Sequence, residues 1–189
     1  YLIVKQDREY YILAEARQII LGKNYKIIKK IKGRDLAGLE YEPLLKIKGL
    51  KETGKKSHYI ALADFVTTEE GTGIVHTAVV YGEDDYNLGL KLDLPVAPLL
   101  NEQGIFNERA PKLVQGKYFE DSEKIIKDDL EKRGLLYKKE EQVHSYPLCW
   151  RCETKLFYNA IPAWFINIQK IKPRLLELNE KINWYPEHL

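Results

Sequence analysis

Residues 70–85 read EGTGIVHTAVVYGEDD, and this stretch predicts a strand, a turn and the start of a helix. Gly71 and Gly73 allow a tight turn and a close approach of the backbone to a ligand, whereas the Ile-Val pair that follows favours an extended run. Gly82 ends that run in front of three acidic residues, which suit the first turn of a helix.

His76 and Asp85 are nine residues apart in this stretch, one at a strand end and the other at a helix start. Such a pair can face one pocket, where the histidine would be a polar group that recognises the shape of a ligand and the carboxylate would bind a cation. Each residue also has a simpler explanation. Acids at a helix N-terminus usually complement the helix dipole, and a single histidine beside an apolar strand is usually a packed residue.

The chain has 189 residues, of which 44% are hydrophobic and 31% are charged, so it is globular and long enough for one large domain and an appendage. Residues 1–60 carry 14 Lys and Arg against 7 Asp and Glu, whereas residues 61–189 carry 16 against 21. The basic first third is either a face that meets phosphates or an ordinary solvated lysine face. Its lysines are Lys23, Lys26, Lys29, Lys30, Lys32, Lys46, Lys48, Lys51, Lys55 and Lys56.

No apolar run approaches membrane-spanning length and no signal peptide is recognisable, so we expect a soluble, cytoplasmic protein with no membrane partner. The motif Cys149-Trp-Arg-Cys152 suits a reducing compartment and matches half of a tetrahedral thiolate zinc site. Because the chain starts at Tyr1 and contains no Met, we also expect it to be part of a longer protein.

Short apolar runs dominate the chain and predict strands. Residues 1–4 and 10–14 predict a hairpin of two strands, followed by a short helix. Further strand-like runs cover residues 25–31, 43–47, 58–66, 73–78, 95–100 and 135–137. Many short strands with few helices predict an α+β fold that is mainly β and barrel-like.

Three helices are predicted. The clearest covers residues 122–133, with Asp121 or Ser122 as its cap and Gly134 just beyond its end; the others begin near Glu83 and, over residues 174–182, after Pro173. The composition changes near Gln142. We therefore expect one domain over residues 1–142, and a segment over residues 143–189 that carries the cysteine pair and a connection onward.

Three motifs occur in an ordered series: the Gly71–Asp85 stretch, the segment from His144 to Cys152, and the ending from Asn183 to His188. With them, essentially the whole chain resembles the inserted editing domain (connective polypeptide 1, CP1) of isoleucyl-tRNA synthetase, a class I aminoacyl-tRNA synthetase. Editing domains of the valyl and leucyl enzymes share the Gly-Thr-Gly and Asp elements. His76 and the cysteine motif favour the isoleucyl family.

This resemblance implies a barrel-like editing domain with a few helices, inserted into the Rossmann-type, ATP-binding catalytic core. The implied activity is post-transfer editing, in which the domain hydrolyses the aminoacyl ester of valine mischarged onto isoleucine tRNA. One methylene is worth only about 1–3 kcal/mol of discrimination in an apolar pocket, a magnitude already established for the isoleucyl enzyme itself, so a second sieve is required. The implied partners are the mischarged tRNA and the rest of the synthetase chain.

The resemblance also assigns roles to residues. Asp85 would bind the α-ammonium group of the aminoacyl ester, and His76 would line the side-chain pocket and help to exclude isoleucine. Hydrolysis would use a positioned water, backbone donors and a tRNA hydroxyl, with no covalent protein intermediate and no cofactor. Asp84 is an alternative anchor. The substrate-binding candidates are Gly71, Thr72, Gly73, Thr77 and Asp84.

Some features depart from the family pattern. The threonine-rich segment that forms the other wall of the pocket is expected upstream of Tyr1, so editing by this chain alone is left open. Cys149 and Cys152 resemble one of two thiolate pairs, the other lying upstream, and zinc is expected at most in the intact parent enzyme. His144 is a possible third ligand that we take as structural. Ala78-Val79-Val80 replaces the family's Ala-Pro-Ala and remains compatible with a strand.

Two other functions compete with editing by an isoleucyl enzyme. One is a non-catalytic insert that positions the tRNA acceptor end through the lysine-rich first third. The other is the equivalent valyl-tRNA synthetase editing domain, which would deacylate threonine.

Overall fold

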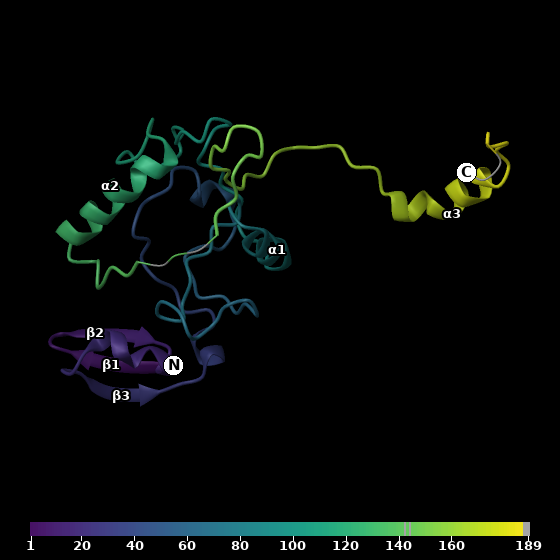
Figure 1. Cartoon of the computed structure of the whole chain (residues 1–189). Coiled ribbons are helices and arrows are strands. Elements are labelled where there is room, and N and C mark those ends of the chain that lie inside the picture. The colour runs from purple at the N-terminus through teal and green to yellow at the C-terminus, as the bar shows by residue number, and fades with distance from the viewer. Residues whose placement is uncertain (142, 144, 187–189) are drawn as a thin grey trace.

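A computed structural model describes residues 1–141, 143 and 145–186 (Figure 1). The domain boundary predicted near Gln142, His144 and the last three residues of the chain lie outside the described residues. The predicted α+β class is confirmed. The elements, in chain order, are β1 (Leu2–Gln6), β2 (Glu9–Leu13), η1 (Glu15–Leu21), β3 (Lys26–Lys30), η2 (Gly33–Leu36), η3 (Lys51–Thr53), α1 (Glu83–Lys91), α2 (Phe119–Lys132) and α3 (Ile168–Asn179).

The sheet has three antiparallel strands in the order β2-β1-β3. Alternating residues of β1 point into the core: Leu2 is 2% exposed and Val4 is fully buried. Leu13 of β2 and Leu21 of η1 complete this small core. The predicted hairpin, the short helix after it and the strand near residues 25–31 are therefore confirmed.

The predicted barrel is not formed by the described residues, because the sheet is open and has β2 and β3 as its edges. The runs at residues 43–47, 58–66, 73–78, 95–100 and 135–137 are not strands. Instead, isolated bridges such as Glu40 to Tyr59 and Leu100 to Phe106 tie these irregular segments together. An apolar run becomes a strand only where a neighbouring segment satisfies its backbone groups along a ladder, and these segments meet at single points.

Helix α1 begins at Glu83, as predicted, and packs closely on the segment before it. A Cβ atom at Gly89 would lie 2.5 Å from Cγ1 of Val79, so the glycine allows the helix to approach that side chain. Leu88 is buried beside it. The glycine therefore fixes how near α1 lies to residues 73–81.

Helix α2 confirms the prediction for residues 122–133 but starts three residues earlier, with Tyr118 at the N-cap and no side-chain cap. The predicted caps are wrong, since Asp121 and Ser122 lie within the helix. The Ser122 hydroxyl donates to the Phe119 carbonyl at 2.6 Å. Gly134 follows the helix with a φ of 68°, the left-handed conformation expected at a helix end.

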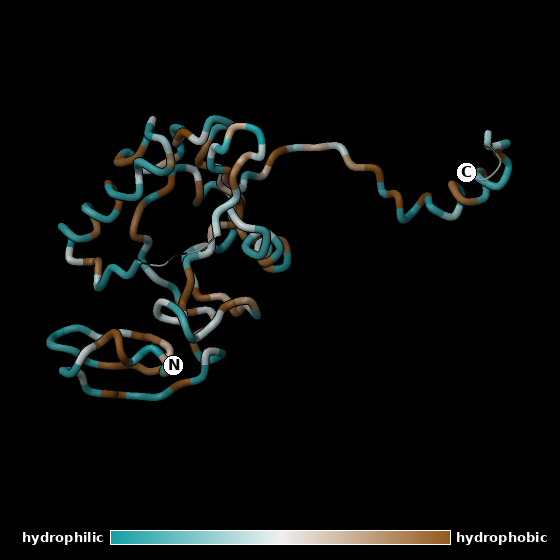
Figure 2. The backbone as a smooth tube through the Cα atoms, viewed as in Figure 1, coloured by the Kyte–Doolittle hydropathy of each residue, from teal (hydrophilic) through white to brown (hydrophobic). Residues whose placement is uncertain are grey.

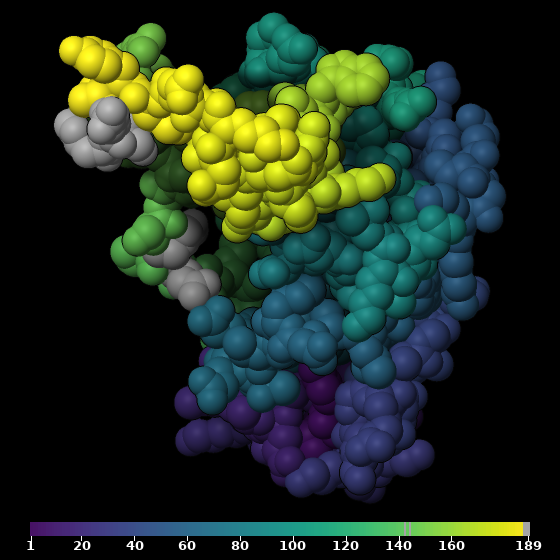
Figure 3. Space-filling view, turned by 90° about the vertical axis from the view of Figure 1, so that its right-hand side faces the viewer, coloured from purple at the N-terminus to yellow at the C-terminus, as the bar shows by residue number. Residues whose placement is uncertain are grey.

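Helix α3 lies apart from the rest of the molecule, at the end of an extended segment (Figure 1). Figure 3, turned by 90°, accordingly places α3 in front of the body. It begins at Ile168 and contains Pro173, so the start predicted after that proline is wrong. The side chain of Asn167 caps it by accepting a hydrogen bond from the Lys170 amide at 3.0 Å. Along α3, hydrophobic and hydrophilic residues alternate without a covering layer (Figure 2).

Within the described residues, no helix is both long and apolar enough to span a membrane.

Candidate functional site

A cavity of about 600 Å³ lies beside the Gly71–Asp85 stretch. Its walls come from three segments, residues 57–66, 73–81 and 94–99, with additional residues from elsewhere in the body. Pockets that hold small ligands commonly measure about 300–1,000 Å³ and are mostly apolar with a few polar groups. Here the apolar lining includes Leu50, Val66, Val79, Val80, Leu88 and Leu99.

The cavity brings together some of the predicted site residues and leaves others outside. Gly73, His76 and Thr77 line it. Among the other candidates, Gly71, Thr72 and Asp84 are exposed and Asp85 is half-buried, and none of these four is part of the lining. The predicted pocket residues therefore separate into a histidine-bearing wall and an acidic helix start next to it.

Asp85 lies in the first turn of α1, and Leu88 of the same helix lines the cavity. The carboxylate of Asp85 lies over the N-cap residue Gly82, since a Cβ atom there would be 2.9 Å from Oδ2 of Asp85. Three acids share this turn, so they also complement the helix dipole, as the simpler explanation has it. Of the two neighbouring candidates, Asp85 is the less exposed and Asp84 points to solvent.

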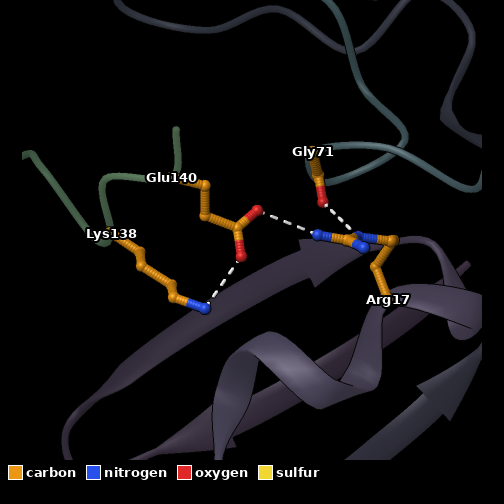
Figure 4. Close-up of polar contacts among 4 residues, drawn as sticks. All are labelled: Arg17, Gly71, Lys138 and Glu140. Atoms are coloured by element: carbon orange, nitrogen blue, oxygen red, sulfur yellow. Dashed lines mark hydrogen bonds and ion pairs between the residues drawn. The ribbon is translucent and has the colours of Figure 1, made fainter. Parts of the chain in front are cut away.

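The glycine turn before His76 is held by residues at the N-terminal sheet and in η1, the short helix that follows β2. Three consecutive backbone carbonyls of the turn accept hydrogen bonds of 2.6–2.9 Å from this unit. Figure 4 shows one of them, from Arg17 to Gly71. The three pairs are Arg17 Nε to Gly71 O, Ala14 N to Thr72 O and the Tyr1 hydroxyl to Gly73 O.

Gly73 has the conformation and the surroundings that only glycine accommodates. Its φ is 74°, and a Cβ atom at this position would lie 2.6 Å from the Cβ of Ala14. Gly71 also has a positive φ, of 52°, but no atom lies within 4 Å of its Cβ position. The predicted tight turn is thus present, and Gly73 is where it packs against the sheet.

Tyr81 holds two walls of this cavity together and is not among the candidates from the sequence. It lines the cavity, and its hydroxyl accepts hydrogen bonds from the backbone amides of Leu99 at 2.6 Å and Leu100 at 2.9 Å. These bonds attach one wall of the cavity to another. An aromatic residue between Val80 and Gly82 gives no signal of this role in the sequence.

A second histidine, His58, was also missed. It lines the same cavity and has a φ of 57°, which is uncommon for a residue with a side chain. Its Nδ1 is 3.1 Å from the Ser57 hydroxyl, and its ring meets Tyr41 edge-on at a centroid distance of 6.0 Å. The only sequence signal was the residue type.

Cys149 and Cys152 lie in a small hairpin closed by the bridge between Leu148 and Lys155. The pKa of the Cys152 thiol is lowered, first by the Thr154 hydroxyl, 3.2 Å from its sulfur, then by the Thr154 backbone and by Cys149. The described residues contain no group of three or more potential metal ligands. The two thiols by themselves leave a tetrahedral zinc site incomplete, so the described residues alone do not form one.

Comparison with known proteins gives matches that cover all or nearly all of this chain. The chain is 40% identical over 189 residues to the isoleucine–tRNA ligase of Clostridium acetobutylicum, covering all of this chain and 18% of the relative. It is 39% identical, with the same coverage, to that of Picrophilus torridus, and 40% identical, over 95% of this chain, to that of Pyrococcus abyssi. The chain thus spans less than a fifth of the length of these relatives. No family model matches it.

Proposed function

We propose that this chain, all of which matches 18% of the length of isoleucine–tRNA ligases, is the post-transfer editing domain of such an enzyme. The proposed reaction is hydrolysis of the ester that joins valine to isoleucine tRNA. The observation that carries the proposal is the cavity beside the Gly71–Asp85 stretch, whose wall includes His76 and Thr77. The three relatives compared above are named isoleucine–tRNA ligases, which favours the isoleucyl over the valyl alternative.

In this proposal the apolar wall receives the side chain of valine, and His76, an exposed residue of the lining, limits the size of the side chain that the pocket accepts. An apolar surface alone separates valine from isoleucine by only about 1–3 kcal/mol, a value already established for the isoleucyl enzyme. Exclusion of the larger side chain must therefore be steric. His76 belongs to a wall whose backbone is fixed at one end by the three carbonyl contacts to Tyr1, Ala14 and Arg17.

Asp85 is proposed to bind the α-ammonium group of the ester. It is half-buried at the start of α1, a helix that contributes Leu88 to the cavity. A carboxylate in such a partly desolvated place forms a charge-assisted hydrogen bond to an ammonium group. This contact would fix the ester so that a water molecule can attack its carbonyl carbon, with no covalent intermediate on the protein.

The test is deacylation of valyl-tRNA and isoleucyl-tRNA, both on isoleucine tRNA, by this chain extended upstream through the expected threonine-rich segment, and by the Asp85→Ala variant of the same extended chain. We expect loss of valine only, and a fall in rate of at least about tenfold in the variant, because the ester is no longer held in place. Glu83→Ala is the matched control, since Glu83 is an exposed acid in the same helical turn. Hydrolysis unchanged in Asp85→Ala but lost in Asp84→Ala would move the anchor by one residue.

His76→Ala tests the steric role separately. We expect this variant to hydrolyse isoleucyl-tRNA as well, because the pocket becomes larger. If isoleucine is still excluded, another residue of the wall sets the size limit.

A second candidate function, a non-catalytic insert that positions tRNA, is favoured by one observation. All five residues of β3 are exposed, and three of them are Lys26, Lys29 and Lys30. Basic side chains that contact phosphates make binding depend on salt. Weaker tRNA binding and a smaller salt dependence on changing these three lysines to Gln, together with no deacylation by the parent chain, would support the insert over the hydrolase.

A further inference from the structure

Arg17 contacts two segments that are far from it in the sequence (Figure 4). Its Nε donates to the Gly71 carbonyl at 2.9 Å, across 54 positions of the chain. A terminal nitrogen of the same guanidinium donates to the Glu140 carboxylate at 2.9 Å, across 123 positions. The other oxygen of Glu140 accepts from Lys138 at 2.8 Å.

We propose that Arg17 is a positioning residue of the cavity, which couples the glycine turn at Gly71 to the segment of residues 138–140. If residues 138–140 moved, the guanidinium of Arg17 would move with them and shift the turn at Gly71. The shifted turn would then move the wall that bears His76. The effect on hydrolysis rests on the proposed function. The coupling itself rests only on the contacts of Arg17.

This arrangement differs from an ordinary surface ion pair, which contributes little because both partners are mobile and solvated. The Arg17 side chain is only 20% exposed, although that of Glu140 is 45% exposed. Two different nitrogens of one rigid, planar group hold two partners, a geometry that a lysine ammonium does not reproduce. Arg17 also lies at a kink of η1, with a φ of −101° and a ψ of 15°.

The contacts on Glu140 keep it available as the second partner. Hydrogen bonding from Lys138, the largest influence, and the charges of Lys138 and Arg17 lower the pKa of Glu140 below its ordinary value. The carboxylate is therefore charged at neutral pH.

The first test is amide hydrogen exchange measured by mass spectrometry on peptides that cover residues 70–76, in the unaltered chain and in Arg17→Lys and Glu140→Gln. We expect exchange in these peptides to rise about fivefold in both variants, the ratio that one typical net hydrogen bond represents. The decisive variant is Glu140→Gln, since Glu140 does not contact the turn itself. Exchange at residues 70–76 that stays at the unaltered rate in Glu140→Gln would overturn the coupling.

Arg133→Lys is the matched control. Arg133 pairs with Asp129 at 2.8 Å within one helix and is 39% exposed, so it is an arginine–carboxylate pair that bridges no distant segments. We expect no change of exchange at residues 70–76 in this variant. A change as large as in Arg17→Lys would mean that the turn responds to general destabilisation, and would overturn the specific role of Arg17.

Deacylation of valyl-tRNA by the same variants separates the two proposals. We expect Arg17→Lys and Glu140→Gln to lower kcat more than they raise KM, because a misplaced wall binds the ester but orients it poorly. Altered exchange with unaltered hydrolysis would overturn the effect on the cavity and leave the editing proposal standing. Altered exchange, together with no ester hydrolysis by the chain extended upstream through the threonine-rich segment, would instead remove the editing proposal and retain the coupling.

Discussion

The N-terminal sheet and α3 both have apolar residues at the regular spacing of their element, but those of the sheet are buried and those of α3 are exposed. In the sheet, Leu2, Val4 and Leu13 are at most 2% exposed, whereas in α3 the residues at helical spacing, Ile168, Ile171, Leu175 and Leu178, are 41–50% exposed. Both patterns have the period of their element. The difference shows that a pattern determines which element forms, while burial depends on whether another element covers it.

Shortening one leucine in each region tests whether burial separates the sheet from α3. Leu13→Ala should lower the free energy of unfolding by about 2–5 kcal/mol, because Leu13 is 1% exposed and its removal leaves a cavity in the core. Leu175→Ala, with a side chain that is 46% exposed, should change it by less than about 0.5 kcal/mol. Urea unfolding followed by circular dichroism measures both. Equal losses would contradict the distinction between the two regions.

Gly73→Ala tests the contact between the glycine turn and Ala14, at the edge of the N-terminal core. The left-handed conformation costs about 1–2 kcal/mol for a residue with a Cβ atom, and the contact with Ala14 adds about 1–3 kcal/mol of overpacking. We therefore expect a loss of about 2–5 kcal/mol in urea unfolding. Gly71→Ala is the control, because it has a positive φ but open space, and should show only the conformational cost. Similar losses in the two variants would mean that the contact with Ala14 is easily relieved.

Tyr81→Phe should destabilise the chain by about 1–3 kcal/mol, because the amides of Leu99 and Leu100 lose their shared acceptor. The matched control is Tyr10→Phe in β2, where the ring is 61% exposed and a negligible effect is expected. Thermal unfolding and hydrogen exchange of residues 95–100 would both report the change. Unaltered exchange there would show that other contacts hold this wall.

The smallest expected effect concerns charge on α3. Hydrogen bonds from Arg174 and then Lys181 lower the pKa of Glu177 from its ordinary value of 4.5. Since the folded pKa is the lower one, this carboxylate stabilises the helix above pH 4.5, and that contribution is lost as the pH falls through the folded pKa. The helical signal of the chain should slightly exceed that of Glu177→Gln at neutral pH, and the difference should vanish in acid. A difference that grows on acidification would contradict this assignment.

The fold was predictable where local signals agree with their surroundings. The hairpin, the strand near Ile27 and the helix at Glu83 follow from period, turn residues and acids in a first turn. The barrel prediction was wrong, because a run such as residues 58–66 shows the composition of a strand without showing whether a partner strand lies along it. The start of α3 had a signal that was given too little weight, namely Asn167, a good helix cap six residues before Pro173.

The site was predictable in part. Motif and resemblance singled out Gly73, His76 and Thr77, which do line the cavity. They could not indicate Tyr81 or Arg17, because the importance of each depends on partners at least 18 residues away in the chain. The roles assigned to His76 and Asp85 stay predictions for the deacylation experiment.

The contact between Gly73 and Ala14 has a consequence for how sequences of this kind can diverge. Gly73 is already the smallest residue, and Ala14 is 1% exposed with its amide bound to the turn, so neither position has room for a larger side chain. The two positions should vary jointly across related chains, with only small residues allowed at position 14 wherever position 73 keeps this conformation. Substitutions in the turn and at the end of the adjoining strand are then correlated across related chains. The requirement for small residues in the core therefore also limits which residues the site can carry.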